Sequence, residues 1–128
     1  MICDFRGFVR PEMVKRRPAV VVSPRLRRRQ KLCTIVPLST TPPNPAAAYH
    51  HKFHLDPVMP KPYDSPVQWV KADMLYTVSF DRLFLPFEKK DGTGKRAYDV
   101  RVLDRSDMLK IQQCILHGIG LTALTDYL

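Results

Sequence analysis

Two stretches of the sequence place groups suited to phosphate binding at the ends of apolar runs. Arg17 is the last of three consecutive cations that precede the apolar residues 19–22, and Ser39 and Thr40 follow the apolar residues 35–38. The planar guanidinium of an arginine donates two hydrogen bonds to a phosphate and stays charged, and a neighbouring hydroxyl can donate to another oxygen. These residue types permit a phosphodiester site. On the residues alone, a solvated cation and a loop cap remain the simpler interpretation.

The chemistry open to such a site is cleavage of RNA without a metal ion. The 2′-hydroxyl of RNA can attack the adjacent phosphorus, so the protein has to orient that hydroxyl, move protons and stabilise the charge on the phosphorane oxygens. Arg17 is the candidate for charge stabilisation, and Ser39 or Thr40 is the candidate for orienting the phosphate. The sequence does not decide between the two hydroxyls.

Short strands are predicted as the elements that hold these side chains. Alternating or β-branched apolar runs indicate strands at residues 2–5, 17–23, 32–38, 49–55, 67–72 and 74–80. The segment 89–95 carries a strong hairpin-turn signal, so its flanks, residues 82–87 and 97–102, are predicted to pair as two more strands.

One helix is predicted at the C-terminal end. Apolar residues recur there at helical spacing, after an N-cap at Asp104 or Ser106 and before Gly118 and Gly120, which should stop the helix. Strands and helices do not alternate along the chain, so a parallel sheet is not expected. The pattern predicts a mainly β fold with a C-terminal α-helix, arranged as a small antiparallel barrel.

The composition bounds the class of protein. With 128 residues, the chain is expected to form a single domain spanning residues 1–128. Its 21 Lys and Arg against 12 Asp and Glu give a net charge of +9, which favours a polyanionic partner, either a nucleic acid or an acidic protein. The three cysteines indicate free thiols in a reducing cytoplasm. No apolar run approaches the length of a membrane span, so a cytoplasmic location without membrane contact is expected.

Several other chemistries find no support. His50, His51 and His54 cluster in sequence, but no cysteine pair or HExxH motif supplies further zinc ligands, so no metal site is expected. Phosphate-loop, dinucleotide-binding and serine-hydrolase motifs are absent, so no cofactor is expected. The segment 92–95, Gly-Thr-Gly-Lys, fits a hairpin turn better than a phosphate loop because strands are predicted on both sides.

Several segments taken together resemble a known family. They are Lys-Arg-Arg-Pro-Ala-Val-Val-Val-Ser-Pro at 15–24, Ile-Val-Pro-Leu-Ser-Thr-Thr-Pro at 35–42 and Val-Lys-Ala-Asp-Met-Leu-Tyr-Thr-Val at 70–78, with Cys-Asp-Phe at 3–5 and Arg-Leu at 82–83. In this order they resemble the MazF/PemK toxins of type II toxin–antitoxin systems. The resemblance implies a homodimeric, SH3-like barrel that cleaves single-stranded RNA, such as mRNA, without metal. It also implies 2′,3′-cyclic phosphate and 5′-hydroxyl ends, and a cognate antitoxin protein that occupies the RNA groove.

The resemblance also assigns roles to residues. It implies that Arg17 lies at the scissile phosphate, that Glu12 supplies an acidic group nearby, and that Ser39 stands where the family usually has threonine, with Thr40 next to it. The glycine-rich loop usual before the Arg-Pro pair is replaced by the stiffer, more basic residues 10–16. The basic residues near the predicted site are expected to contact RNA: Lys15, Arg16, Arg25, Arg27, Arg28, Arg29 and Lys31. The basic run in residues 25–31 could equally be a solvated turn.

Two alternative functions remain open. The same barrel is shared by toxins that resemble the gyrase poison CcdB, which act by binding a protein, so the chain could be a non-catalytic inhibitor. It could also be a module that binds RNA and has lost cleavage, an alternative kept open by serine in place of threonine at position 39. Incubation of the protein with RNA in EDTA separates cleavage from both alternatives.

Overall fold

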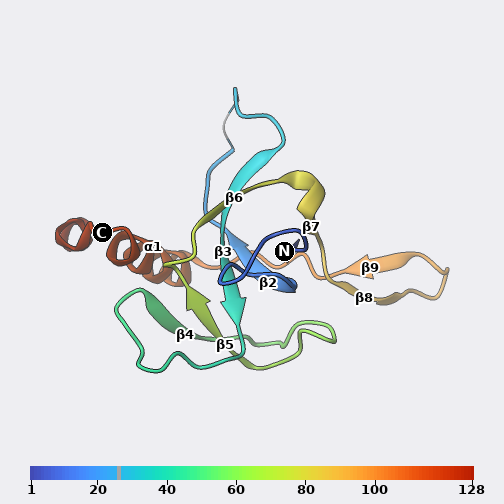
Figure 1. Cartoon of the computed structure of the whole chain (residues 1–128). Helices are drawn as coiled ribbons and strands as arrows, with labels where there is room; N and C mark the ends of the chain where they lie inside the picture. Colours follow the sequence, from blue (N-terminus) through green and yellow to red (C-terminus); the bar gives the residue numbers. More distant parts are fainter. Residues whose placement is uncertain (26) are drawn as a thin grey trace.

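A computed structural model describes residues 1–25 and 27–128 of the protein (Figure 1). Within these residues the chain forms nine strands, one α-helix and two 3₁₀ helices. The strands are β1 (Ile2–Asp4), β2 (Arg16–Val21), β3 (Leu32–Ser39), β4 (His50–His54), β5 (Val67–Lys71), β6 (Tyr76–Ser79), β7 (Leu83–Phe84), β8 (Phe87–Lys90) and β9 (Arg96–Tyr98). The helices are η1 (Phe80–Arg82), α1 (Arg105–Gly118) and η2 (Thr122–Tyr127).

Strand β3 lies at the centre of the sheet and pairs with three neighbours, all antiparallel. One of its edges pairs with β2 through residues 35–37. Its other edge pairs with β6 over residues 32–35 and with β5 at Leu38 and Ser39. Pro37 has no N–H to donate, and it lies next to the point where the partner changes from β6 to β5. Beyond these strands, β1 and β7 extend the sheet from β2, and β4 extends it from β5.

The two faces of the sheet carry separate apolar clusters because successive residues of a strand point to opposite sides. On one face, buried Val36 and Val70 pack with Ile111 of α1. On the other face, buried Ile35 packs with Phe5, which begins the loop between β1 and β2. The helix therefore covers one face, and the loop of residues 5–15 covers part of the other.

Capping motifs mark both ends of α1. Asp104 is the N-cap, and its carboxylate accepts a hydrogen bond from the third helical N–H at 2.7 Å. At the other end, the N–H of Leu121 donates to the carbonyl of Leu116 at 2.8 Å and the N–H of Gly120 donates to His117 at 3.2 Å. These two bonds and the φ of +80° at Gly120 form a Schellman motif. Within the described residues, no helix has both the length and the apolar character needed to cross a membrane.

The fold class is confirmed as mainly β with a C-terminal helix, but two details of the prediction need correction. A closed barrel is not confirmed, because in the described residues the order of paired strands ends at β4 and β7 and no pairing joins these two strands. The hairpin is also shorter than predicted, because it pairs β8 with β9 and not residues 82–87 with 97–102. Leu83 and Phe84 pair with β1 instead, and Pro86, which lacks an N–H, separates them from β8.

Gly118→Ala tests how closely the end of α1 packs on the sheet. A Cβ at residue 118 would stand 3.0 Å from the carbonyl oxygen of Ala72 and 3.2 Å from the Cα of Asp73. Overpacking against backbone outweighs the helical preference for alanine, so we expect the free energy of unfolding to fall by about 1–2 kcal/mol in urea denaturation. Gly92→Ala is the matched control, because a Cβ there meets nothing within 4 Å. Equal stability of the two variants would contradict the close contact.

Candidate functional site

Five polar side chains gather at and just beyond the ends of four strands. Arg17 lies at the start of β2, Ser39 at the end of β3 and His50 at the start of β4. Lys71 is the last residue of β5, and Asp73 lies two residues after it. We call these five residues the Arg17 group.

The register of β2 and β3 places Arg17 next to Ser39. Ala19 pairs with Pro37 in this antiparallel pair. Continuing the same register by two residues sets Arg17 opposite Ser39, and side chains of opposite residues lie on the same face. By this register, the two residues that the sequence singles out for phosphate binding point to the same face of adjacent strands.

The pairing of β5 with its two neighbours adds Lys71 and His50 to the same face. Ser39 pairs with Trp69, and His50 pairs with Lys71. Trp69 and Lys71 are two residues apart, so their side chains point the same way. Four side chains of the group thus share one face, and the half-buried ring of Trp69 lies beside them.

Arg17 is half-buried and keeps an unused donor. Its Nε is enclosed, and among the described residues no acceptor hydrogen-bonds to it. A buried donor without a partner is destabilising by about 1–3 kcal/mol. Such an atom is suited to a ligand that brings its own acceptor, and an anionic oxygen would satisfy both the donor and the charge.

Of the two hydroxyls, that of Ser39 lies on the face of Arg17. Ser39 is 5% exposed, and its Oγ accepts a hydrogen bond from the N–H of Thr41 at 3.2 Å. The hydroxyl proton remains available for a second acceptor. Thr40 is exposed and follows the last residue of β3. The geometry therefore favours Ser39 as the partner of Arg17.

Lys71 and Asp73 were not among the residues chosen from the sequence. Burial lowers the pKa of Lys71 from the ordinary value of 10.5; the carboxylate of Asp73 opposes this shift, and the nearby charge of Arg17 adds to it. A lysine with a lowered pKa releases its proton more readily than a solvated one. Both residues lie in the segment 70–78 that carries part of the family resemblance, which is the signal that could have drawn attention to them.

His50 is held between a backbone donor and a carboxylate. Its Nδ1 accepts a hydrogen bond from the N–H of Ala47 at 3.0 Å, so the neutral ring carries its proton on Nε2. That Nε2 lies 3.8 Å from a carboxylate oxygen of Asp73. The pKa of His50 is lowered mainly by burial and also by the charge of Lys71, against the effect of Asp73. In the described residues no group of three or more His, Cys, Asp or Glu is placed to hold a metal ion.

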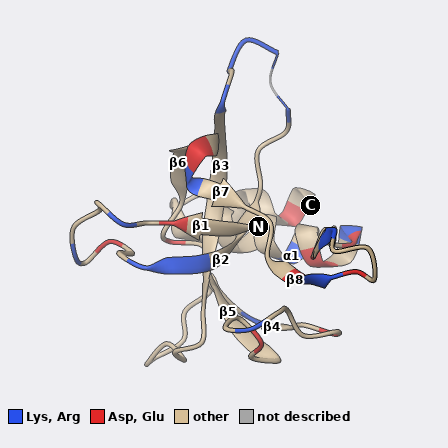
Figure 2. Ribbon diagram, turned by 90° about the vertical axis from the view of Figure 1, so that its right-hand side faces the viewer, with Lys and Arg blue, Asp and Glu red and all other residues tan. Residues whose placement is uncertain are grey.

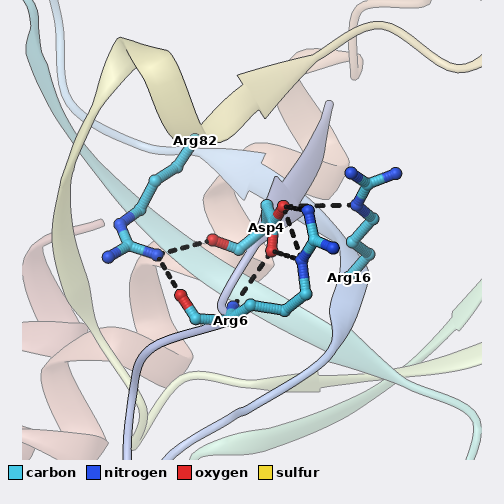
Figure 3. Close-up of polar contacts among 4 residues, drawn as sticks. All are labelled: Asp4, Arg6, Arg16 and Arg82. Atoms are coloured by element: carbon cyan, nitrogen blue, oxygen red, sulfur yellow. Dashed lines mark hydrogen bonds and ion pairs between the residues drawn. The ribbon is translucent and has the colours of Figure 1, made fainter.

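The loop of residues 5–15, which leads into Arg17, is fixed by a cluster of arginines around Asp4 (Figure 3). The carboxylate of Asp4 accepts hydrogen bonds from Arg6 at 2.6–3.0 Å and from the Nε of Arg16 at 3.2 Å. These bonds, chiefly those from Arg6, hold the pKa of Asp4 well below its usual range. Arg82 donates to the backbone carbonyls of Asp4 and Arg6, both at 2.9 Å. The entry and exit of the loop are thereby tied together.

Arg16 and Arg17 point in opposite directions, although the sequence groups them. Arg16 pairs with Asp4 across β1 and β2, whereas Arg17 pairs with Cys3. Lys15 is exposed just before β2. Of the three consecutive cations, only Arg17 belongs to the Arg17 group.

Glu12 is not brought into the Arg17 group. It is exposed in the loop, where its backbone N–H donates to Val9 at 2.9 Å. None of the ion pairs or hydrogen bonds found in residues 1–25 and 27–128 joins its carboxylate to Arg17. A contact between Glu12 and a substrate therefore stays a prediction.

The other basic residues predicted to bind RNA lie at the far end of β2 and β3. Figure 2 shows the loop between these strands as a basic projection well away from β4 and β5. Its exposed cations, with apolar side chains such as those of Leu32 and Phe80, line an open hollow of about 1230 Å³. Along β2, this loop begins about 17 Å from Arg17, at 3.3 Å per residue of extended strand. RNA binding by these cations stays a prediction: Arg25, Arg27, Arg28, Arg29 and Lys31.

Comparison with known proteins decides the family. A family model described as PemK-like, MazF-like toxin of type II toxin-antitoxin system matches residues 1–118. The chain belongs to this family. Toxins of the family are generally endoribonucleases, and a type II system implies an antitoxin partner and an RNA substrate. An uncharacterized protein of Haemophilus influenzae is similar to the chain, with 28% identity over 127 residues that cover 97% of this chain and 82% of that protein.

Tyr76→Phe tests how the loop before Arg17 is held. The hydroxyl of Tyr76 accepts a hydrogen bond from the N–H of Met13 at 3.1 Å, and its ring stacks on Phe8 with centroids 5.6 Å apart. Loss of the hydroxyl removes one part-buried bond, so we expect a loss of about 1 kcal/mol of stability and faster hydrogen exchange at the amide of Met13. Tyr127→Phe, in an 86% exposed residue, is the control and should change neither quantity.

Proposed function

We propose that this toxin is a metal-independent endoribonuclease of single-stranded RNA and that the Arg17 group is its catalytic site. The observation that carries the proposal is the buried, unpartnered Nε of Arg17, set by strand register beside the hydroxyl of Ser39. Lys71 and Asp73 on the same side of the sheet add a proton donor and a proton acceptor. Together these groups meet the needs of attack by a 2′-hydroxyl on its own phosphodiester.

Each group has a distinct role in the proposed reaction. The carboxylate of Asp73 accepts the proton of the 2′-hydroxyl, and the 2′-oxygen forms a bond to phosphorus. Arg17 and the hydroxyl of Ser39 donate hydrogen bonds to the phosphorane oxygens. The bond from phosphorus to the 5′-oxygen then breaks, and the ammonium of Lys71 gives that oxygen a proton. The products are a 2′,3′-cyclic phosphate and a 5′-hydroxyl.

Further elements of the proposal rest on the family. The toxin acts as a homodimer of a single domain, residues 1–128, and a cognate antitoxin neutralises it by occupying the RNA groove. Glu12 and Thr40 are proposed as auxiliary residues, because both are exposed near the ends of the strands that carry Arg17 and Ser39.

Arg17→Ala is the direct test of the catalytic site. Loss of the guanidinium removes the main charge stabilisation of the phosphorane, so we expect kcat/KM for RNA to fall by at least about 100-fold in buffer with EDTA. Arg105→Ala, which removes an exposed arginine at the start of α1, should leave cleavage unchanged. Circular dichroism checks that both variants fold, and end-group analysis should find cyclic phosphate and 5′-hydroxyl termini.

Three other results of the same assay would contradict the proposal. Full cleavage by Arg17→Ala would remove Arg17 from the chemistry. Intact RNA with the unmodified protein would favour a toxin that binds a protein target or RNA without cutting it. Cleavage that stops in EDTA would indicate a metal-dependent reaction.

The pH dependence of kcat tests the role of Lys71. The lysine acts as an acid only while protonated, and its pKa is lowered, so kcat should fall with rising pH at values below 10.5. Lys71→Arg retains the charge but stays protonated throughout this range, so we expect lower activity and no alkaline decline up to about pH 10. Lys52→Arg, at an exposed position of β4, is the control and should keep the profile of the unmodified protein. An unchanged profile in Lys71→Arg would assign the proton donor elsewhere.

A further inference from the structure

The hairpin of β8 and β9 lies apart from the main sheet (Figure 1). Its side chains are mostly exposed on both faces. Its register sets Phe87 opposite Tyr98 and Lys90 opposite Arg96, with a bulge between residues 87 and 89. The bulge restores the alternation, so these four side chains share one face. Two aromatic rings and two cations therefore stand together on an element that no other strand pairs with in the described residues.

Both rings of this face are open to solvent. Phe87 is 45% exposed and Tyr98 is 40% exposed, and they meet edge to face with centroids 6.0 Å apart. The guanidinium of Arg96 lies over the ring of Phe87 at 5.7 Å from its centroid. Exposed rings add little to the apolar core. Packing therefore does not account for aromatic residues at these two positions.

The charge of the hairpin is suited to a polyanion. Residues 87–98 carry four cations and two carboxylates. One carboxylate, that of Asp91, is occupied by the turn, where it accepts hydrogen bonds from residues 93 and 95 at 2.6–2.9 Å. Glu88 is the other carboxylate, and it is exposed next to the bulge.

A second exposed cation and ring lie close to this hairpin along the chain. Phe84 is 37% exposed, and the guanidinium of Arg16 lies 5.3 Å from the centroid of its ring. Arg16 is the chain neighbour of Arg17, and Phe84 precedes Phe87 by three residues, a span of at most about 11 Å. The rings of Phe84, Phe87 and Tyr98, with Arg16, Lys90 and Arg96, thus form a sequence of exposed side chains. Because Arg16 and Arg17 point to opposite faces of β2, this sequence lies on the other side of that strand from the Arg17 side chain. We call these six residues the aromatic strip.

We propose that the aromatic strip binds nucleotides of single-stranded RNA that lie beyond those held by the Arg17 group. Exposed aromatic rings stack on bases of any sequence, and arginines beside them add charge and cation–π attraction, which is the combination that single-strand binding uses. An acidic protein segment would use the cations but would leave three exposed rings without planar partners. The inference rests on the proposed function for its substrate. It extends that function by predicting that affinity depends on the length of the RNA.

Binding of RNA of two lengths tests the strip. The probes are fluorescein-labelled 2′-O-methyl RNAs of mixed sequence, about 15 and about 5 nucleotides long, which cannot be cleaved because the attacking hydroxyl is blocked. We expect Phe87→Ala/Tyr98→Ala to raise the Kd of the longer probe about tenfold in fluorescence anisotropy, and to leave that of the shorter probe unchanged. With cleavable RNA of the longer length, KM should rise while kcat at saturation stays the same.

Two further variants separate stacking from a general disturbance of the hairpin. Phe87→Trp/Tyr98→Phe keeps both rings and should bind the longer probe as the unmodified protein does. Val100→Ala/Val102→Ala removes exposed apolar side chains from the following segment, where Val102 is 91% exposed, and should also have no effect. Circular dichroism and thermal unfolding confirm that each variant is folded.

The outcomes distinguish this inference from the proposed function. An unchanged Kd for the longer probe, or equal losses for both probes, would overturn the strip. Weaker binding of polyglutamate with unchanged binding of RNA would also overturn it and would indicate a protein partner. If the unmodified protein binds the longer probe through the strip but cleaves no RNA, the strip stands and the endoribonuclease proposal fails.

Discussion

Strand β3 exchanges backbone hydrogen bonds with β2, β5 and β6, and the position of nearly every polar residue of interest follows from those three pairings. The pairing with β2 sets Arg17 beside Ser39, and the pairing with β5 brings Lys71 to the same face. A slip of one residue in either pair would turn these polar side chains toward the helix-covered face, among its buried apolar residues. Burial of Val36 on one side and Ile35 on the other prevents that slip. The apolar core thus determines the geometry of the polar group.

The charges of the Arg17 group are destabilising, whereas the apolar core is stabilising. Arg17, Lys71 and His50 bring groups that carry or acquire positive charge to one place, and burial lowers the pKa of both Lys71 and His50. Asp73 offsets part of this, but the Nε of Arg17 has no acceptor. The folded chain therefore holds an arrangement that is less stable alone than it would be with an anion bound. Natural proteins accept such local instability where a ligand relieves it.

The sequence predicted the strands and the helix because their signals are local. Apolar alternation, the cap at Asp104 and the glycine at position 120 each act within a few residues, and the structure places the helix and β1 to β6 within a residue or two of the prediction. The strands predicted at 82–87 and 97–102 differ by more. Arg17 and Ser39 could be chosen because both end apolar runs. Lys71, Asp73 and His50 could not be grouped with them, because their proximity depends on pairings between distant strands. That the sheet does not close could not be predicted, for a similar reason. The two-residue length of β7 depends on its partner β1 and on Pro86, and not on the composition of β7 itself.

The contact of Gly118 with the backbone at Ala72 and Asp73 joins the last helical residue to the edge of the Arg17 group. These positions are far apart in the chain, and the protein is synthesised from the N-terminus. A nascent chain that lacks α1 contains every member of the Arg17 group but not the surface on which Asp73 rests. The surroundings of that carboxylate are completed only when the C-terminal helix leaves the ribosome and docks. The order of synthesis thereby sets the Arg17 group in its final surroundings only after residue 118 has been made.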